Sequence, residues 1–231
     1  MEAHDIETQT WTGNPPSVLV KAYLSKVYTW MAVSLLVTAG TALYAVNSAE
    51  VTLWMFDHPW LPLIGMLGII LIMSFGVRVL TSGALAVLLL VFSAVLGLVF
   101  APILLLYTTH SLALTFASTA GMFGAMAFYG ATTRRNLSGM GRTLMMLLFG
   151  LIIAGIANIF WGNGMMDLII SGVGVVVFSL FTAYDTQKIL EQGLCTDEEL
   201  RRKGAVLGAL TLYLDFINLF LYLLRFLGRS K

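Results

Sequence analysis

Seven long apolar runs constrain the fold of this chain more than any other feature. They cover residues 24–46, 60–80, 83–107, 112–131, 143–161, 165–187 and 205–224. Each is close to the roughly 20 residues that an α-helix needs to cross the hydrocarbon core of a bilayer. Backbone N–H and C=O groups find no water there, so a run of this length has to be helical. The sequence therefore predicts an all-α, polytopic membrane protein with seven transmembrane helices.

The composition agrees with a lipid environment. Hydrophobic residues make up 58% of the chain and charged residues only 11%, whereas soluble domains carry about 25% charge. The mean hydropathy of +0.89 leaves too little polar surface to cover a soluble globule. No basic tract points to a nucleic-acid partner, so the expected surroundings are the lipid bilayer. Cys195 is the single cysteine, which excludes an internal disulfide and a cysteine-built metal site.

The first 20 residues differ from the rest of the chain. They are polar and acidic, they contain Pro15 and Pro16, and they show no cleavable signal sequence. We expect residues 1–20 to form a disordered cytoplasmic tail. Because the remaining loops are short, we expect residues 21–231 to form a single transmembrane domain.

Basic residues alternate between the connections and predict the orientation. The segments before the first span and after the second, fourth and sixth spans hold Lys21, Lys26, Arg78, Arg134, Arg135, Arg142, Lys188, Arg201, Arg202 and Lys203. The other three connections lack Lys and Arg and hold Glu50, Asp57 and Asp167 instead. These acids would raise the local concentration of cations at an outer mouth, or they are merely solvated loop acids. Basic connections stay in the cytoplasm, so the N-terminus is expected to be cytoplasmic.

The C-terminus does not fit this rule. Seven full crossings place it outside, yet it carries Arg225, Arg229 and Lys231. Either the last span breaks the charge rule, or it enters the membrane and returns to the cytoplasmic side. The last span also contains Asp215 within its apolar stretch. A helix with these features is expected in the middle of the bundle, shielded from lipid.

The last span carries a polar stripe. Thr211, Asp215, Asn218 and Tyr222 are spaced four, three and four residues apart, which places them on one face of a helix. An ionisable group at membrane depth is costly, and it usually marks an ion or proton pathway. The alternative is a polar patch that only fixes helix packing.

A second carboxylate lies near the end of the sixth span. Asp185 shares a helical face with Thr182 and Thr186. Two carboxylates brought together inside a bundle cannot both ionise easily, so Asp185 and Asp215 would hold one proton between them. Arg78 is expected at the same membrane face and could pair with Asp185 as a gate. Taken singly, Asp185 could be an interfacial residue and Arg78 a plain positive-inside anchor.

Three stretches resemble the Bax inhibitor family, the transmembrane Bax-inhibitor-motif proteins, in its bacterial inner-membrane branch. They are Phe-Thr-Ala-Tyr-Asp-Thr-Gln at 181–187, the segment 207–220 around Asp215, and the segment 123–138. The resemblance covers nearly the whole chain after about residue 20. The family often has Asp where this chain has Asn136.

The resemblance implies a seven-helix fold with the last helix wrapped by the other six. It also implies a pH-sensitive calcium leak in the inner membrane. Asp185 and Asp215 would then be the proton sensor, and Arg78 would hold Asp185 as a latch. Calcium prefers oxygen ligands, which Asp185, Asp215 and Asn218 can supply to a passing ion. No resident cofactor is expected.

Two other function classes are alternatives to the leak. The first is an interaction protein that modulates a membrane-anchored AAA-type protease or translocation machinery through the tail and the loop 188–203. In that loop Thr196 and Glu199 have capping-box spacing and predict a helix start. The second class, an enzyme, is not expected, because His4, His58 and His110 lie in the tail or at span ends, where they cannot serve an intramembrane site.

Overall fold

The computed structural model describes residues 18–58, 60–162 and 164–228, and these residues form eight helices without a strand. The helices are α1 (Val18–Asn47), α2 (Ala49–Asp57), α3 (Trp60–Gly76), α4 (Ser82–Leu106), α5 (Thr109–Thr132), α6 (Met140–Trp161), α7 (Gly164–Gln192) and α8 (Glu198–Leu227). Six of them are long and apolar enough to cross a membrane, and α2 with α3 can supply a seventh crossing. The all-α, polytopic fold predicted from the apolar runs is confirmed.

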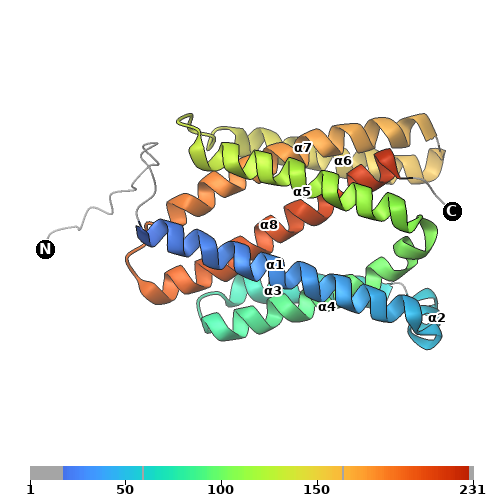
Figure 1. Ribbon diagram of the computed structural model, residues 1–231, viewed down its shortest axis with the longest axis horizontal. Coiled ribbons are helices and arrows are strands. Elements are labelled where there is room, and N and C mark those ends of the chain that lie inside the picture. The colour runs from blue at the N-terminus through green and yellow to red at the C-terminus, as the bar shows by residue number, and fades with distance from the viewer. Residues whose placement is uncertain (1–17, 59, 163, 229–231) are drawn as a thin grey trace, which may run out of the picture.

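Helix α8 is the centre of the bundle. It runs diagonally between α1–α4 on one side and α5–α7 on the other, as Figure 1 shows. It packs on α1, α4, α5 and α7. The side chains of Leu212, Tyr213 and Leu219 are fully buried along it. The central position predicted for the last helix is therefore correct, but α8 packs mainly on four helices and is not wrapped by six, because α3 and α6 lie outside α4 and α7. Helix α8 joins two groups of helices that otherwise touch little.

Close approach between helices depends on small residues. A Cβ atom on Gly97 of α4 would collide with the backbone carbonyl of Thr38 on α1. A Cβ atom on Gly130 of α5 would likewise meet the carbonyl of Ala183 on α7. Without a side chain at these points the helix backbones can touch, which is the main packing device of membrane helices.

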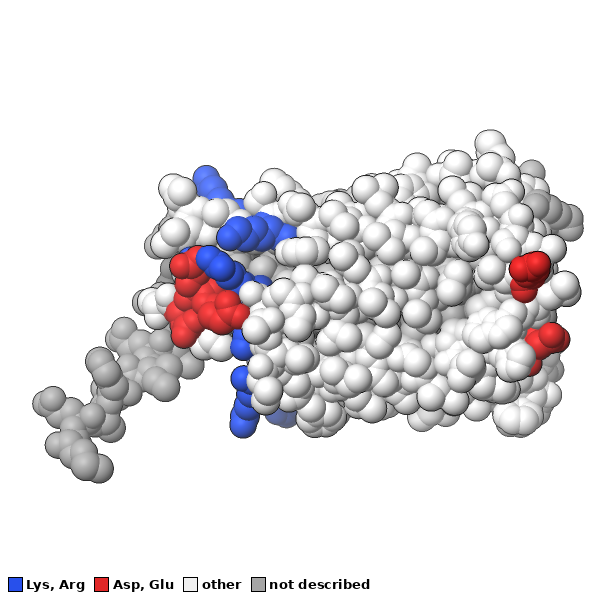
Figure 2. All heavy atoms as spheres, turned by 90° about the horizontal axis from the view of Figure 1, so that it is seen from below, with Lys and Arg blue, Asp and Glu red and all other residues white. Residues whose placement is uncertain are grey.

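The charges lie at the two ends of the bundle. Figure 2 shows Lys and Arg gathered at one end, while acidic groups occur at both ends and the visible surface of the long middle section carries neither. We call the first end the basic end. Helices α1, α4, α6 and α8 begin there, and α7 ends there. An uncharged middle section flanked by charged ends fits a helix bundle embedded in a bilayer.

Helix α8 crosses the bundle completely. Its 30 residues correspond to about 45 Å at 1.5 Å per residue. The described chain therefore ends at the side opposite the basic end, as Figure 1 shows. There Arg225 forms an ion pair with Asp167 at 3.8 Å. The alternative in which the last span returns to its side of entry is wrong for this structure. Arg229 and Lys231 lie outside the described residues.

Several helix ends differ from the sequence-based boundaries. Helix α1 begins at Val18, so residues 18–20 are helical and not part of a disordered tail; residues 1–17 lie outside the described part. Residues 49–57 form a short helix, α2, where only a connection was expected. Helix α3 ends at Gly76, four residues before the predicted end of its span.

Candidate functional site

Asp185 and Asp215 face each other across the interface between α7 and α8. Asp185 precedes the end of α7 by seven residues, which is about 10 Å of helix. Asp215 lies 17 residues after the start of α8, but the first turns of α8 are polar and extend beyond the apolar core. Because α7 continues to Gln192, Asp185 is set deeply enough to meet Asp215.

The two carboxyl groups are near enough to act on each other. Two ionised carboxylates offer only acceptors, so a hydrogen bond between them would need a proton on one of them. Asp185 is 8% exposed and Asp215 is 5% exposed. The second oxygen of Asp215, Oδ2, is buried without a hydrogen-bond partner. The pair is therefore a buried contact between two carboxyl groups, in which one oxygen lacks a hydrogen-bond partner among the described residues.

The surroundings of the pair are polar on the α7 side. Thr182, Thr186 and Gln187 are all buried. The Thr182 hydroxyl donates to the carbonyl of Phe178 at 2.9 Å, within its own helix. The nearest cation acting on Asp185 is Lys188, one residue beyond Gln187 on the same helix. Its ammonium lies 6.0 Å from the centre of the Tyr184 ring.

Gln187 ties the connection between α5 and α6 to α7. Its Oε1 accepts from the backbone N–H of Leu137 at 2.7 Å, and its Nε2 donates to the carbonyl of Arg135 at 2.9 Å. Asn136 lies between these two anchor points and accepts from the N–H of Ser138 at 2.8 Å. An aspartate would accept the same bond, so the departure from the family at this position leaves the turn intact.

The polar stripe predicted on α8 does not act as one unit. Asp215 is buried as expected, but Thr211 and Asn218 are only half-buried and donate to carbonyls one turn earlier, those of Leu207 and Leu214. Tyr222 stacks on Phe178 of α7, with ring centroids 5.6 Å apart. Of the four residues, only Asp215 reaches Asp185.

Arg78 is not joined to the carboxyl pair. It is exposed in the turn after α3, and within the described residues it forms no ion pair with Asp185. The neighbouring residue Val77 is anchored instead, because its carbonyl accepts from the ammonium of Lys203 at 3.2 Å. The structure therefore does not form the contact on which the predicted latch depends.

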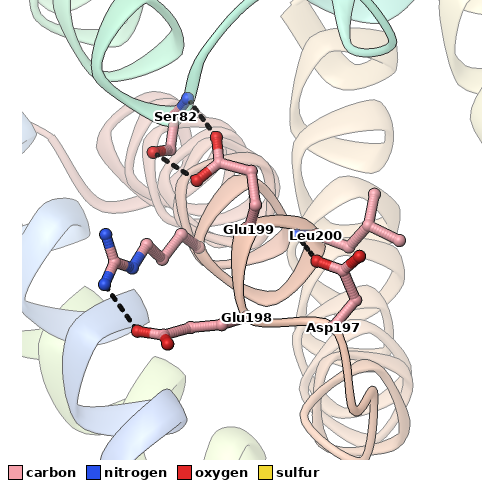
Figure 3. Close-up of polar contacts among 6 residues, drawn as sticks. Ser82, Asp197, Glu198, Glu199 and Leu200 are labelled. Carbon is pink, nitrogen blue, oxygen red and sulfur yellow. Dashed lines mark hydrogen bonds and ion pairs between the residues drawn. The ribbon is translucent and has the colours of Figure 1, made fainter.

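The basic end is held together by the first turn of α8, shown in Figure 3. Glu199 accepts from the backbone N–H of Ser82 at 3.0 Å and from its hydroxyl at 3.3 Å. This contact caps the start of α4 from another helix. Asp197, and not Thr196, caps α8 by accepting from the N–H of Leu200. The predicted capping box is therefore wrong by one residue, and Glu199 serves α4 instead.

A second polar cluster was missed by sequence reasoning. The hydroxyl groups of Thr38 and Tyr213 lie 2.6 Å apart, and Thr38 also donates to the carbonyl of Ser93. Tyr213 and Asp215 are two residues apart, so the two polar clusters lie on opposite faces of α8. The sequence signal for the cluster around Tyr213 is weak, because this residue stands within an apolar run and its partners lie on two distant helices, α1 and α4.

The three acids predicted at an outer mouth occupy different settings. Glu50 lies in the first turn of α2, and Asp57 is the last residue of that helix. Asp167 is in the first turn of α7 and is partnered, because Asn158 donates to its Oδ1 at 3.0 Å and Arg225 is nearby. Among the residues that the structure describes, no group of three or more His, Cys, Asp and Glu side chains is arranged to hold a metal ion.

Comparison with known proteins agrees with this architecture. Residues 20–231 match the family described as "Inhibitor of apoptosis-promoting Bax1". The chain is 43% identical over 223 residues to the inner membrane protein YbhL of Escherichia coli K12, covering 94% of this chain and 95% of that protein. It is 37% identical over 226 residues to an uncharacterized protein of Borreliella burgdorferi, covering 95% and 97%. The chain thus belongs to the Bax inhibitor family as a multi-pass membrane protein.

Proposed function

We propose that this protein is a pH-regulated calcium leak of the inner membrane, with its N-terminus in the cytoplasm. The observation that carries the proposal is the buried contact between Asp185 and Asp215 at the interface of the central helix. A carboxyl pair in a protein interior is a two-state element, because its geometry depends on whether it holds a proton.

The sign of the pH response follows from this contact. While one proton is shared, the hydrogen bond holds α7 against α8 and the path stays closed. When that proton is lost, two carboxylates repel each other in a poorly hydrated interface and favour separation. The ionised oxygens are also the ligands that a passing calcium ion prefers. Cation flux should therefore rise as the pH rises.

The location and orientation are supported by separate observations. The relative YbhL is described as an inner membrane protein. The basic end holds most of the Lys and Arg residues of the described chain, which fits the cytoplasmic side. Glu50 and Asp57 at the opposite end add negative potential, which raises the local concentration of cations there.

The proposal is tested by calcium flux into liposomes that contain the purified full-length protein, measured from about pH 5 to about pH 8. We expect a protein-dependent flux that is larger at the higher pH. Liposomes without protein give the background. A flux equal to that background at every pH would contradict the proposal that this protein is a calcium leak.

The interaction protein predicted as the alternative is separated by deletion of residues 1–17. Helix α1 begins at Val18, so this deletion leaves every described helix intact. A leak gated at Asp185 and Asp215 keeps its flux and its pH response without these residues. A regulator that acts through the tail would lose its effect on a membrane-anchored protease in the same variant.

A further inference from the structure

A cleft of about 640 Å³ opens between α6, α7 and α8 at the end opposite the basic end. Its wall along α6 is apolar and includes Ile152, Gly155 and Ile156, while its rim is polar and includes Asn158, Asp167 and Arg225. Leu151 lies seven residues before Asn158, so the wall extends about 10 Å from the rim along α6. The cleft is thus polar at the membrane surface and apolar toward the membrane interior.

The rim carries one cation and one anion whose bonding capacity is mostly unused. Arg225 and Asp167 are about half exposed, and their closest atoms are 3.8 Å apart, which is a loose ion pair. Arg225 has five N–H donors, and no hydrogen bond from them is formed to the described residues. Asn158 donates to Asp167 through its Nδ2, but its Oδ1 is buried without a partner.

These groups define the chemistry of a ligand. Arg225 suits a phosphate, which accepts paired N–H donors. The half-exposed Asp167 carboxylate can accept further donors, and a primary ammonium supplies three N–H groups. The apolar wall needs a hydrocarbon chain. One molecule of the surrounding bilayer combines all three features, namely a phospholipid with a primary ammonium in its headgroup.

We propose that the cleft between α6, α7 and α8 binds one phosphatidylethanolamine molecule. The phosphate contacts Arg225, the ammonium contacts Asp167, and an acyl chain lies against Ile152 and Ile156. Phosphatidylcholine lacks N–H donors for Asp167, and phosphatidylglycerol lacks a cation for it. The site therefore discriminates among headgroups while the apolar wall accepts any acyl chain. This site is distinct from the carboxyl pair, because the Phe178–Tyr222 stack lies between them.

Gly155 provides a way to block the cleft. A Cβ atom on Gly155 would meet no atom within 4 Å, so a larger side chain enters the open space without a clash. Gly150 on the same helix is equally free of neighbours but does not line the cleft. Gly155→Leu and Gly150→Leu therefore add the same side chain to the same helix and differ in whether they fill the site.

The test is native mass spectrometry of the purified full-length protein after exchange into each of the three phospholipids in turn. The unmodified protein should retain one phosphatidylethanolamine about ten times more strongly than the other two, as expected for one charge-assisted hydrogen bond. Gly155→Leu should lose this retention and Gly150→Leu should keep it. Equal retention of all three lipids by the unmodified protein, or equal retention by the two glycine variants, would overturn the proposal.

Two charge variants test the headgroup assignment. Asp167→Asn should remove the preference for phosphatidylethanolamine over phosphatidylglycerol but keep lipid bound through Arg225. Arg225→Gln should lose retention of both lipids. Arg142→Gln removes a positive charge from an exposed residue at the basic end. It should change neither the retention of lipid nor the headgroup preference. If Asp167→Asn keeps the full headgroup preference while binding lipid, the assignment of the ammonium to Asp167 is wrong.

Discussion

The ring of Tyr222 on α8 lies against the ring of Phe178 on α7. Phe178 is seven residues before Asp185, and Tyr222 is seven residues after Asp215, so both rings lie on the side of the carboxyl pair away from the basic end. Because the helices are antiparallel, Asp185 meets Asp215 and Phe178 meets Tyr222 in the same register. Tyr222 also fills the space over Gly174, where a Cβ atom would collide with the ring. The aromatic contact therefore lies between the carboxyl pair and the opposite end of the bundle, where it would act as a barrier on the proposed path along this interface.

Removal of this barrier should increase the leak. We predict that Tyr222→Ala raises calcium flux into liposomes at the higher pH, where the carboxyl pair is proposed to be open, because it removes the stacked ring without changing the pair. Tyr222→Phe keeps the stacked ring and should leave the flux near that of the unmodified protein. Equal flux in the Ala and Phe variants would show that the aromatic stack is not the barrier.

The contact between Glu199 and Ser82 should stabilise the basic end. Glu199→Ala leaves the first N–H group of α4 without its acceptor, and the loss of such a cap costs about 1 kcal/mol. Glu198→Ala removes only a solvent-exposed ion pair with Arg202, and exposed pairs of this kind contribute little to stability. Thermal unfolding in detergent should show a lower melting temperature for Glu199→Ala than for Glu198→Ala. The reverse order would contradict the capping role.

Labelling with membrane-impermeant thiol reagents tests the orientation. Cys195→Ser provides a cysteine-free background, since the chain has one cysteine. In that background Glu50→Cys and Leu227→Cys should react from the outside, and Arg142→Cys only from the cytoplasm. The position of Leu227, an exposed residue at the end of α8, follows from the complete crossing by this helix. Reaction of position 227 only from the cytoplasm would mean that the last helix returns to its side of entry.

Much of the fold could be predicted because a bilayer demands long apolar helices, and their number and order are read directly from the seven runs. The meeting of Asp185 and Asp215 could be anticipated from the cost of buried charge together with the family resemblance. Its geometry depended on the continuation of α7 to Gln192, which no hydropathy signal reveals because that turn is polar.

The details that sequence reasoning missed depend on partners far away in the chain. Glu199 has a capping-box spacing with Thr196, yet its partner is Ser82, 117 residues earlier. The rotation of α8 is set by the helices packed around it, so Thr211 and Asn218 turn away from the pair that Asp215 joins. Arg78 was expected at Asp185 from its membrane level and from the family resemblance, and neither fixes which side chains meet across a bundle.

The central claim is that the proton shared by Asp185 and Asp215 controls the leak. The most direct test is calcium flux into liposomes as a function of pH for the unmodified protein, Asp185→Asn and Glu191→Gln. Glu191 is on the same helix near the basic end, so its variant removes a carboxylate outside the pair. The account predicts that flux rises with pH in the unmodified protein and in Glu191→Gln, and that Asp185→Asn loses this dependence. A pH response retained in Asp185→Asn, or lost equally in Glu191→Gln, would contradict control by the carboxyl pair.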